Sequence, residues 1–412
     1  MLDNVNEKAQ KKDGMESLTQ LYKIGRGPSS SHTMGPEKAV RLFSEKNPDA
    51  DSFRVVLFGS LADTGKGHGT DTVIKKTFYP NPCEIEFNFE QRELPHPNTM
   101  ELYAYKNGEQ IDMLRVMSVG GGRIKFEGTP LGEEARIYPL TTFAEIAAYC
   151  NEKGIRIWEY AEQIEGEGFY EYMKNIWKHM KAAVERGLAD EGILPGGLNV
   201  KKKAKLLFRD NMSTRSVIIR DDRLVSAYAY AVSEQNAAGE VIVTAPTCGA
   251  AGVMPAVLYH YYRDYGHTDD EIIHALETGG IVGNIIKTNA SISGAECGCQ
   301  AEVGSACAMA SAALCELLGY GTDEIEYAAE VSIEHHLGLT CDPICGLVQI
   351  PCIERNAMAA MRAMNNVSIA ECLCDTRKIT FDDVVKTMLE TGRDLGRKYR
   401  ETSEGGLANL KI

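Results

Sequence analysis

Three cysteines near the end of the chain constrain its fold more than any other feature of the sequence. Cys299 follows a glycine, Cys341 lies two residues before Pro343, and Cys352 follows Pro351, with 41 and 10 residues between successive cysteines. Thiols that bind one metal centre must come from loops that converge, and glycine or proline neighbours let the main chain approach the sulfur. We therefore expect the fold to bring these three loops together.

The cysteines by themselves leave the metal open, because the chain has no Cys-x-x-Cys pair and a buried cysteine is often inert. Zinc competes with an iron–sulfur cluster, and its further ligands would be His335, His336 or Asp342 beside Cys341. Two more cysteines close to the candidate ligands are spare ligands or bystanders: Cys297 and Cys345. The others are expected mostly in the core or on the surface: Cys83, Cys150, Cys248, Cys307, Cys315, Cys372 and Cys374.

Length and charge limit the classes of function. The chain has 412 residues, more than one domain usually holds, so we expect two domains. Its 44 Lys+Arg and 58 Asp+Glu give a net charge of -14, which argues against nucleic acid or an anionic membrane as a partner. The first 14 residues lack the apolar run of a secretion signal. We therefore expect a cytoplasmic protein, in which clustered cysteines more often serve metal binding or catalysis than disulfides.

One uncharged stretch, residues 241–262, has the length of a membrane span. Pro246, Gly249, Gly252 and Pro255 interrupt it, and two prolines and two glycines are unfavourable in a single continuous helix. The stretch is instead interpreted as a buried, site-forming loop followed by a core helix. We expect no membrane partner.

Two regions with different patterns predict an α+β fold. Residues 1–150 alternate apolar and polar residues between turns, which indicates a mixed α/β domain, and residues 151–208 favour a helical connector. Residues 209–412 are rich in Ala, Met and Leu and predict an all-α catalytic domain. The expected strands are 53–58, 83–90, 100–105, 113–119 and 123–126. The expected helices are 18–24, 145–177, 181–186, 222–239, 253–264, 269–287, 301–318, 323–337, 351–372 and 380–399.

Two loops in the first domain carry candidate site residues. A run of hydroxyl side chains before an apolar helical pattern suggests a helix start that could bind a carboxylate, or one that is simply capped. This run consists of Ser29, Ser30, Ser31, His32 and Thr33. The loop 65–71 fails as a phosphate loop, since Gly59 lies one residue too far from Gly65 and Gly67 replaces the required Ser or Thr. Glycines flank His68 there, which favours a role in proton transfer.

Two loops of the second domain combine small and polar residues. The first can present main-chain N–H groups to an anion, through Thr247, Gly249 and Ala250. The second is polar within an otherwise apolar segment, which packing alone does not explain. Its candidates are Lys287 and Ser291 for catalysis and Asn289 for substrate binding.

Six motifs together resemble the bacterial iron–sulfur-dependent L-serine dehydratases of the single-chain type. They are Gly-Pro-Ser-Ser-Ser-His-Thr-Met-Gly-Pro (27–36), Gly-Lys-Gly-His-Gly-Thr-Asp (65–71), His-Pro-Asn-Thr-Met (96–100), Pro-Thr-Cys-Gly-Ala-Ala-Gly (246–252), Gly-Cys-Gln (298–300) and Glu-His-His-Leu-Gly-Leu-Thr-Cys-Asp-Pro (334–343). The resemblance covers nearly the whole chain. It implies that an α/β domain precedes a helical catalytic domain, and that the expected assembly is a homodimer.

The resemblance also implies a chemistry. A [4Fe-4S] cluster would be held by Cys299, Cys341 and Cys352, with its fourth iron free to meet the substrate, L-serine, which becomes pyruvate and ammonia. His68 is implied as a candidate base. His96 and Asn98 are implied as part of a second, regulatory serine site.

One departure from the family concerns the end of the chain. Relatives often have a cysteine there that can cover the open iron, whereas residues 403–412 contain none, so we expect no self-inhibition by the tail. Three alternatives stay open: a pyridoxal-phosphate enzyme with Lys287 as its Schiff base, the same elimination on L-cysteine or L-threonine, and a non-catalytic serine sensor.

Overall fold

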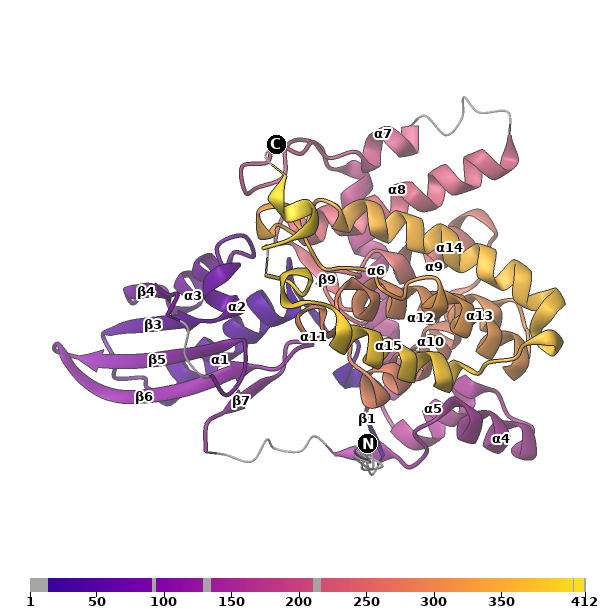
Figure 1. The fold of residues 1–412 in the computed structure, drawn as a ribbon, viewed down its shortest axis with the longest axis horizontal. Helices are drawn as coiled ribbons and strands as arrows, with labels where there is room; N and C mark the ends of the chain where they lie inside the picture. The colour runs from indigo at the N-terminus through magenta and orange to yellow at the C-terminus, as the bar shows by residue number, and fades with distance from the viewer. Residues whose placement is uncertain (1–13, 91–93, 129–134, 210–215, 403, 411–412) are drawn as a thin grey trace, which may run out of the picture.

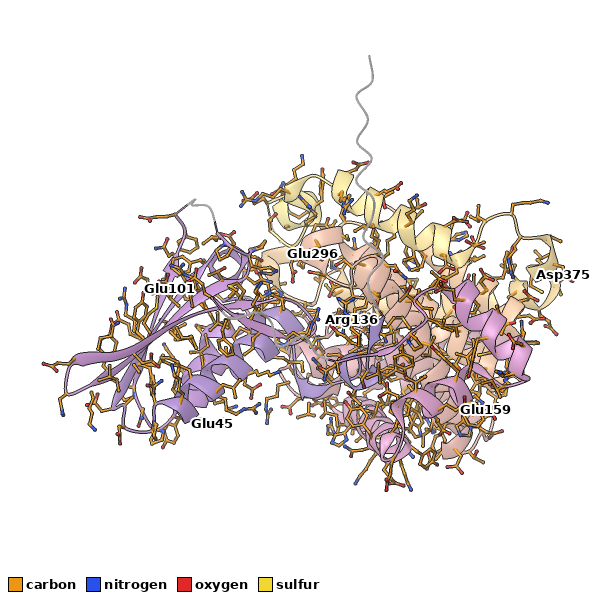
Figure 2. The ribbon with its side chains drawn as sticks, turned by 90° about the horizontal axis from the view of Figure 1, so that it is seen from below. Glu45, Glu101, Arg136, Glu159, Glu296 and Asp375 are labelled. Carbon is orange, nitrogen blue, oxygen red and sulfur yellow. The ribbon has the colours of Figure 1, made fainter. Side chains whose placement is uncertain are left out.

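The computed structural model describes residues 14–90, 94–128, 135–209, 216–402 and 404–410. A smaller half with a five-stranded sheet lies beside a larger half of packed helices, in both overall views (Figure 1, Figure 2). This arrangement confirms the predicted α+β class, with the mixed half first. The domain boundaries at 150 and 208 stay predictions. The segments 1–13, 129–134, 210–215 and 411–412 of those domains lie outside the described residues.

The sheet of the smaller half has the strand order β4-β3-β5-β6-β7. β3 and β4 are parallel, and the other neighbours are antiparallel. A parallel pair needs a crossover, and α2 and α3 provide it because both lie between β3 and β4 in the chain. The strands are β3 (Ser52–Phe58), β4 (Cys83–Asn88), β5 (Thr99–Lys106), β6 (Glu109–Ser118) and β7 (Ile124–Phe126). The helices are α1 (Gly35–Lys46), α2 (Ser60–Asp63) and α3 (Thr70–Phe78).

α1 and α3 cover one face of the sheet and share one apolar core with it. Phe53 of β3 stacks on Phe78 of α3 with ring centroids 4.0 Å apart, and Phe43 of α1 meets the same ring edge-on. All three side chains are almost fully buried. This core fixes α3, and therefore the loop 65–69 before it, against the sheet.

The larger half is built around α12 (Ser305–Leu317), which packs against α9, α10, α13 and α14. Almost every residue of α12 is buried, and most are Ala, Ser or Cys, whose small side chains allow helices to approach closely. The other helices are α4 (Phe143–Lys153), α5 (Ile157–Glu165), α6 (Phe169–Ala189), α7 (Ala204–Arg209), α8 (Val217–Ala237), α9 (Val253–Asp264), α10 (Asp269–Asn289), α11 (Gly294–Cys297), α13 (Thr322–Glu334), α14 (Cys352–Leu373) and α15 (Phe381–Asp394).

The first described segment of the chain belongs to the larger half. β1 (Met15–Glu16) pairs with β8 (Arg136–Tyr138), and β2 (Ile24–Arg26) pairs with β9 (Val241–Val243). Between them, the Tyr22 hydroxyl donates to the Leu276 carbonyl at 2.8 Å. The chain leaves β2 toward the sheet, so the loop 27–34 lies where the two halves meet.

Several predicted elements have different bounds in the structure. The long helix expected over 145–177 is three helices, because Gly154 and Gly168 adopt left-handed conformations that end and begin helices there, and Gly166 also has a positive φ. The helix expected over 18–24 is a single 3-10 turn followed by β2. β9 is a short strand inside the region expected to be helical. In the described part of the chain, no helix has the length and apolarity needed to cross a membrane.

Replacement of Phe53 by Ala should lower the free energy of unfolding by about 3–5 kcal/mol, because it removes a buried ring and leaves a cavity between α1, α3 and the sheet. Urea unfolding followed by circular dichroism measures the change. The matched control is Phe89→Ala, since the Phe89 side chain is 66% exposed and its loss should change stability by less than about 0.5 kcal/mol. Equal effects of the two variants would contradict this description of the core.

Candidate active site

The three candidate ligands converge on one pocket, named the cysteine pocket here. Cys299 directly precedes the helical turn that leads into α12, Cys341 lies on the loop after α13, and Cys352 is the first residue of α14. All three line the same cavity. Two of them thus lie at helix N-terminal ends, where the helix dipole favours negative charge such as a thiolate.

Burial governs the protonation of these thiols. It raises the pKa of Cys299 to about 11, against the opposing effect of Arg355. It also raises the pKa values of Cys341 and Cys352, together with the charges of neighbouring cysteines and glutamates. Three buried thiols therefore carry negative charge only when a strongly positive group, such as a metal centre, lies among them.

The spacing of the possible ligands distinguishes a single metal ion from an iron–sulfur cluster. Within the described residues, no group of three or more His, Cys, Asp or Glu side chains is close enough to hold a metal ion. A four-iron cluster binds each thiolate through a different iron, so its ligands stand further apart than those of one ion. The free space between the side chains is about 20 Å³, room for about one water molecule. Three thiols at this spacing therefore fit a cluster better than a single metal ion.

Arg355 and Asn356 of α14 hold the surrounding loops in place. Arg355 lowers the pKa of the Cys299 thiol through its positive charge, donates to the Thr340 carbonyl at 2.6 Å and donates to Asp342 at 3.3 Å. The Asn356 amide donates to the carbonyl of Gly249 at 2.7 Å and accepts from a main-chain N–H of the same loop. One turn of α14 thus connects all the loops that carry the cysteines and the loop 246–252.

His68 enters the pocket from the smaller half with a defined tautomer. Its Nδ1 lies 3.0 Å from the Thr64 carbonyl, which can only accept, so Nδ1 carries the proton and Nε2 keeps a free lone pair. Burial lowers the pKa of His68 to about 4, so the ring is neutral at pH 7. Nε2 lies 3.8 Å from the Glu401 carboxyl, inside the cysteine pocket. A neutral imidazole with a free lone pair is the form that accepts a proton.

Two glutamates of the pocket had no signal in the sequence analysis. Glu302 accepts a hydrogen bond from the Thr247 hydroxyl at 2.8 Å, and burial raises its pKa. Glu401 comes from the C-terminal segment, where its φ of 57° is unusual for a residue other than glycine. Burial and Glu302 raise the pKa of Glu401 to about 8. Gly294 packs against the same carboxyl, since a Cβ there would lie 2.8 Å from the nearer carboxyl oxygen of Glu302.

The C-terminal segment forms part of the wall of the cysteine pocket. Two main-chain hydrogen bonds join Cys341 to this segment. The Cys341 N–H donates to the Tyr399 carbonyl at 2.8 Å, and the Glu401 N–H donates to the Cys341 carbonyl at 2.9 Å. The Leu407 N–H donates to Asp342 at 2.8 Å. The segment therefore places a carboxyl, and not a cysteine, beside the candidate ligands.

The hydroxyl run 29–33 forms a π-helical turn that leads into α1, so part of its interpretation as a helix start is correct. Ser29 caps this turn through the His32 N–H and also lines the cysteine pocket. The His32 ring is fully buried between Ser31, Ser60 and Thr64. The remaining members, Ser30 and Thr33, are buried as well, and the Thr33 hydroxyl donates to the His68 carbonyl.

Most of the other predicted residues lie outside the lining of this pocket. Lys287 forms an ion pair with Glu16 at 2.7 Å, the Asn289 amide donates to the Thr141 carbonyl, and the Ser291 hydroxyl donates to Glu296. Of the loop 246–252, Gly249 lines the pocket and Ala250 is buried beside it. The predicted regulatory pair is separate too: His96 lines a different cleft together with Arg393, and Asn98 is buried. The rings of His335 and His336 bond main-chain carbonyls of their own helix.

Replacement of His68 by Asn should weaken the loss of stability in acid. The folded protein binds a proton on His68 only near pH 4, whereas the unfolded chain binds it near pH 6.5, so stability falls as the pH drops between these values. The slope from one such histidine is at most about 1.4 kcal/mol per pH unit. Urea unfolding of the metal-free protein at pH 7 and pH 5 measures it. His179→Asn, on the outer side of α6, should behave like the unchanged protein, and an unchanged slope in the His68 variant would contradict the assignment.

Comparison with known families agrees with this geometry. A family model described as the serine dehydratase alpha chain matches residues 98–408, and one described as the serine dehydratase beta chain matches residues 17–79. Both matches lie within one continuous chain, and together they include the loops 27–34 and 65–69, the loop 246–252 and all three cysteines of the pocket.

Individual relatives match over nearly their whole length. The "L-serine dehydratase" of Streptomyces coelicolor is 40% identical over 95% of this chain and 98% of its own. The "L-serine dehydratase 1" of Escherichia coli is 40% identical over 96% and 99%, and the "L-serine dehydratase" of Helicobacter pylori is 34% identical over 95% and 98%. The chain belongs to the serine dehydratase family.

Proposed function

We propose that the protein is an L-serine dehydratase that converts L-serine to pyruvate and ammonia. The observation that carries the proposal is the meeting of three buried thiols with the free Nε2 of His68 in one pocket. The full-length similarity to relatives named L-serine dehydratase supports the same activity.

In this proposal Cys299, Cys341 and Cys352 hold a [4Fe-4S] cluster. When bound, the cluster would supply a Lewis-acidic iron without a cysteine ligand, which makes the substrate hydroxyl a better leaving group. Arg355 supports the ligands, because its positive charge favours the thiolate of Cys299 and its hydrogen bond to the Thr340 carbonyl connects the loop of Cys341 to α14. The dipole of α14 and the cationic Arg355 both stabilise the negative charge of ligated thiolates.

His68 is the base in this proposal. Its Nε2 takes the α-proton of serine, and the electron pair of the broken C–H bond forms the C=C bond as the C–O bond breaks. The departing hydroxide takes this proton from Nε2 and leaves as water, which returns His68 to its neutral form. The product, 2-aminoacrylate, tautomerises to an imine and is hydrolysed to pyruvate and ammonia. The bond from Nδ1 to the Thr64 carbonyl keeps the ring in the required tautomer and orientation.

Residues around the pocket have supporting roles. Ser29 and the main chain of Gly249 line it and are positioned to bind the serine carboxylate. In this proposal Lys287 and Asn289 support the fold and do not contact the substrate. Lys287 anchors the first described segment through its ion pair with Glu16, and Asn289 hydrogen-bonds the chain before α4. A regulatory serine site at His96 and Asn98, a homodimer and a cytoplasmic location stay predictions from the sequence.

Single replacement of Cys299, Cys341 or Cys352 by Ala should abolish both the brown absorbance and the activity, because each removes one cluster ligand. Anaerobic purification, iron and sulfide analysis and a pyruvate assay measure both properties. Cys315→Ala is the matched control, since Cys315 is a buried cysteine of α12 outside the pocket. Absorbance retained in all three ligand variants would contradict the ligand assignment.

Replacement of His68 by Asn should lower kcat by about 10²–10⁴-fold, the usual contribution of a general base. The iron content and the visible spectrum should be unchanged, because His68 is not among the proposed ligands. Activity within twofold of the unchanged enzyme, with the same iron content, would show that another group takes the proton.

A further inference from the structure

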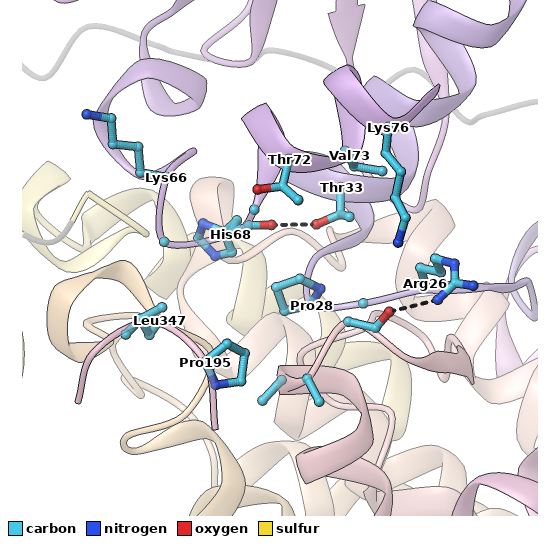
Figure 3. Close-up of a pocket in the computed structure, with 17 residues that line it drawn as sticks. Arg26, Pro28, Thr33, Lys66, His68, Thr72, Val73, Lys76, Pro195 and Leu347 are labelled. Atoms are coloured by element: carbon cyan, nitrogen blue, oxygen red, sulfur yellow. Dashed lines mark hydrogen bonds between the residues drawn. The ribbon is translucent and has the colours of Figure 1, made fainter. Parts of the chain in front are cut away.

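A second cleft opens beside the cysteine pocket and shares a wall with it (Figure 3). Pro28 and His68 line both cavities. The second cavity, named the outer cleft, has a volume of about 360 Å³, within the usual range for small-molecule sites. Both halves of the molecule contribute to it, through β2 and the loop after it, the start of α3, the loop 195–196 and the end of α8.

Two cations line the outer cleft, and Pro28 lies between Arg26 and His68 in the view of Figure 3. Arg26 comes from β2 and Lys76 from α3, and the Lys76 side chain extends toward Arg26 (Figure 3). Arg26 donates to the Gly239 carbonyl at 3.3 Å and lies 4.0 Å from Glu240, with its side chain 46% exposed. Lys66 also lines the cleft, but its ammonium lies 5.2 Å from the centre of the Phe87 ring and points away.

The opposite end of the outer cleft leads to the proposed base. His68 and Arg26 lie on opposite sides of the view in Figure 3, with Pro28 between them. Thr33 donates to the His68 carbonyl at 2.9 Å and fixes the loop that carries the ring. The two cations and His68 therefore lie toward different ends of the outer cleft.

Gly67, in the lining of the outer cleft, allows a close approach between two loops. A Cβ at this position would lie 2.9 Å from the Cys345 carbonyl oxygen and 3.0 Å from that of Gly346. Main-chain atoms cannot yield as a flexible side chain can, so a larger residue would press the loop 65–69 and the loop 344–347 apart. The close approach of these loops requires a residue without a side chain.

We propose that the outer cleft is the passage to the cysteine pocket and that Arg26 and Lys76 form a carboxylate-binding site for small 2-amino and 2-oxo acids. The identity of these ligands rests on the proposed function. The protein has a net charge of -14, which repels anions overall. The local pair of cations is therefore needed to make anion binding favourable in the outer cleft. Serine is a zwitterion without net charge, so the pair binds it only weakly before its carboxylate passes on to Ser29 and Gly249 in the cysteine pocket. Pyruvate carries a full negative charge, so the same pair binds it more tightly.

The test compares the double variant Arg26→Gln/Lys76→Gln with the unchanged holoenzyme, purified without air. The inhibition constant of pyruvate should rise about tenfold, and the KM for L-serine should rise two- to fivefold, with a much smaller change in kcat. In the unchanged enzyme, pyruvate inhibition should weaken as the salt concentration rises, because salt screens exposed charges. In the double variant this salt dependence should be largely lost.

The matched control is Lys75→Gln, which removes the same charge from the neighbouring position of α3, a position outside the lining of the cleft. It should leave the pyruvate inhibition constant unchanged. If the double variant folds poorly, the single variant Lys76→Gln, at an exposed helical position, replaces it in the same inhibition measurement. An unchanged inhibition constant in the Lys76 variant, or an equal change in the Lys75 variant, would overturn the proposal.

A direct binding measurement separates this inference from the proposed function. Calorimetric titration of the protein with pyruvate should detect salt-sensitive binding that weakens about tenfold in the double variant. If the protein forms no pyruvate from serine but binds pyruvate in this way, the proposed function fails and the carboxylate site stands. If it turns over serine but binds pyruvate equally in both proteins, the carboxylate site fails alone.

Discussion

The burial of three thiols in one pocket is the constraint on which the rest of the structure depends. A buried thiol is inert while protonated, and a buried thiolate is costly unless a positive group offsets its charge. The pocket also contains the carboxyls of Glu302 and Glu401, whose pKa values burial raises, and a neutral His68. Apart from Arg355, the surroundings of the thiols thus supply little positive charge. A metal centre is the group that would balance this environment.

The pocket also explains why the two halves of the protein must be joined. The cysteines come from the helical half, whereas His68 and Ser29 come from loops that the sheet, α1 and α3 position. The pairing of β2 with β9 brings the first of these loops to the helical half. The proposed base and the proposed metal ligands come from different halves and meet only when both halves are folded and in contact, so the surface between the halves is part of the proposed site.

Much of this arrangement could be predicted from local sequence patterns. The helix predicted over 253–264 agrees with α9, and the five predicted strands all occur, because their apolar periodicity reflects one buried face. The three cysteines could be selected as candidate ligands because each has a glycine or proline nearby. These neighbours let the main chain approach the sulfur, and that signal is local in the sequence. The helix predicted over 145–177 was wrong, since the glycines at 154, 166 and 168 break it and apolar periodicity alone does not show where a helix ends.

Long-range contacts account for what the sequence did not reveal. Glu401 reaches the pocket through main-chain pairing with Cys341, a contact between positions 60 residues apart that no local pattern announces. Lys287 was a reasonable catalytic candidate from its polar neighbours, but its ammonium pairs with Glu16, 271 residues away. In both cases the tertiary fold, and not the residue type, decides which groups meet.

The central claim is that three cysteines hold a four-iron cluster and leave one iron for the substrate. Mössbauer spectroscopy of protein loaded with ⁵⁷Fe under anaerobic conditions tests it most directly, with and without L-serine. The account predicts a four-iron cluster in which the signal of a single iron changes when L-serine is added. A mononuclear iron signal, or a cluster whose four irons are all unaffected by L-serine, would contradict it.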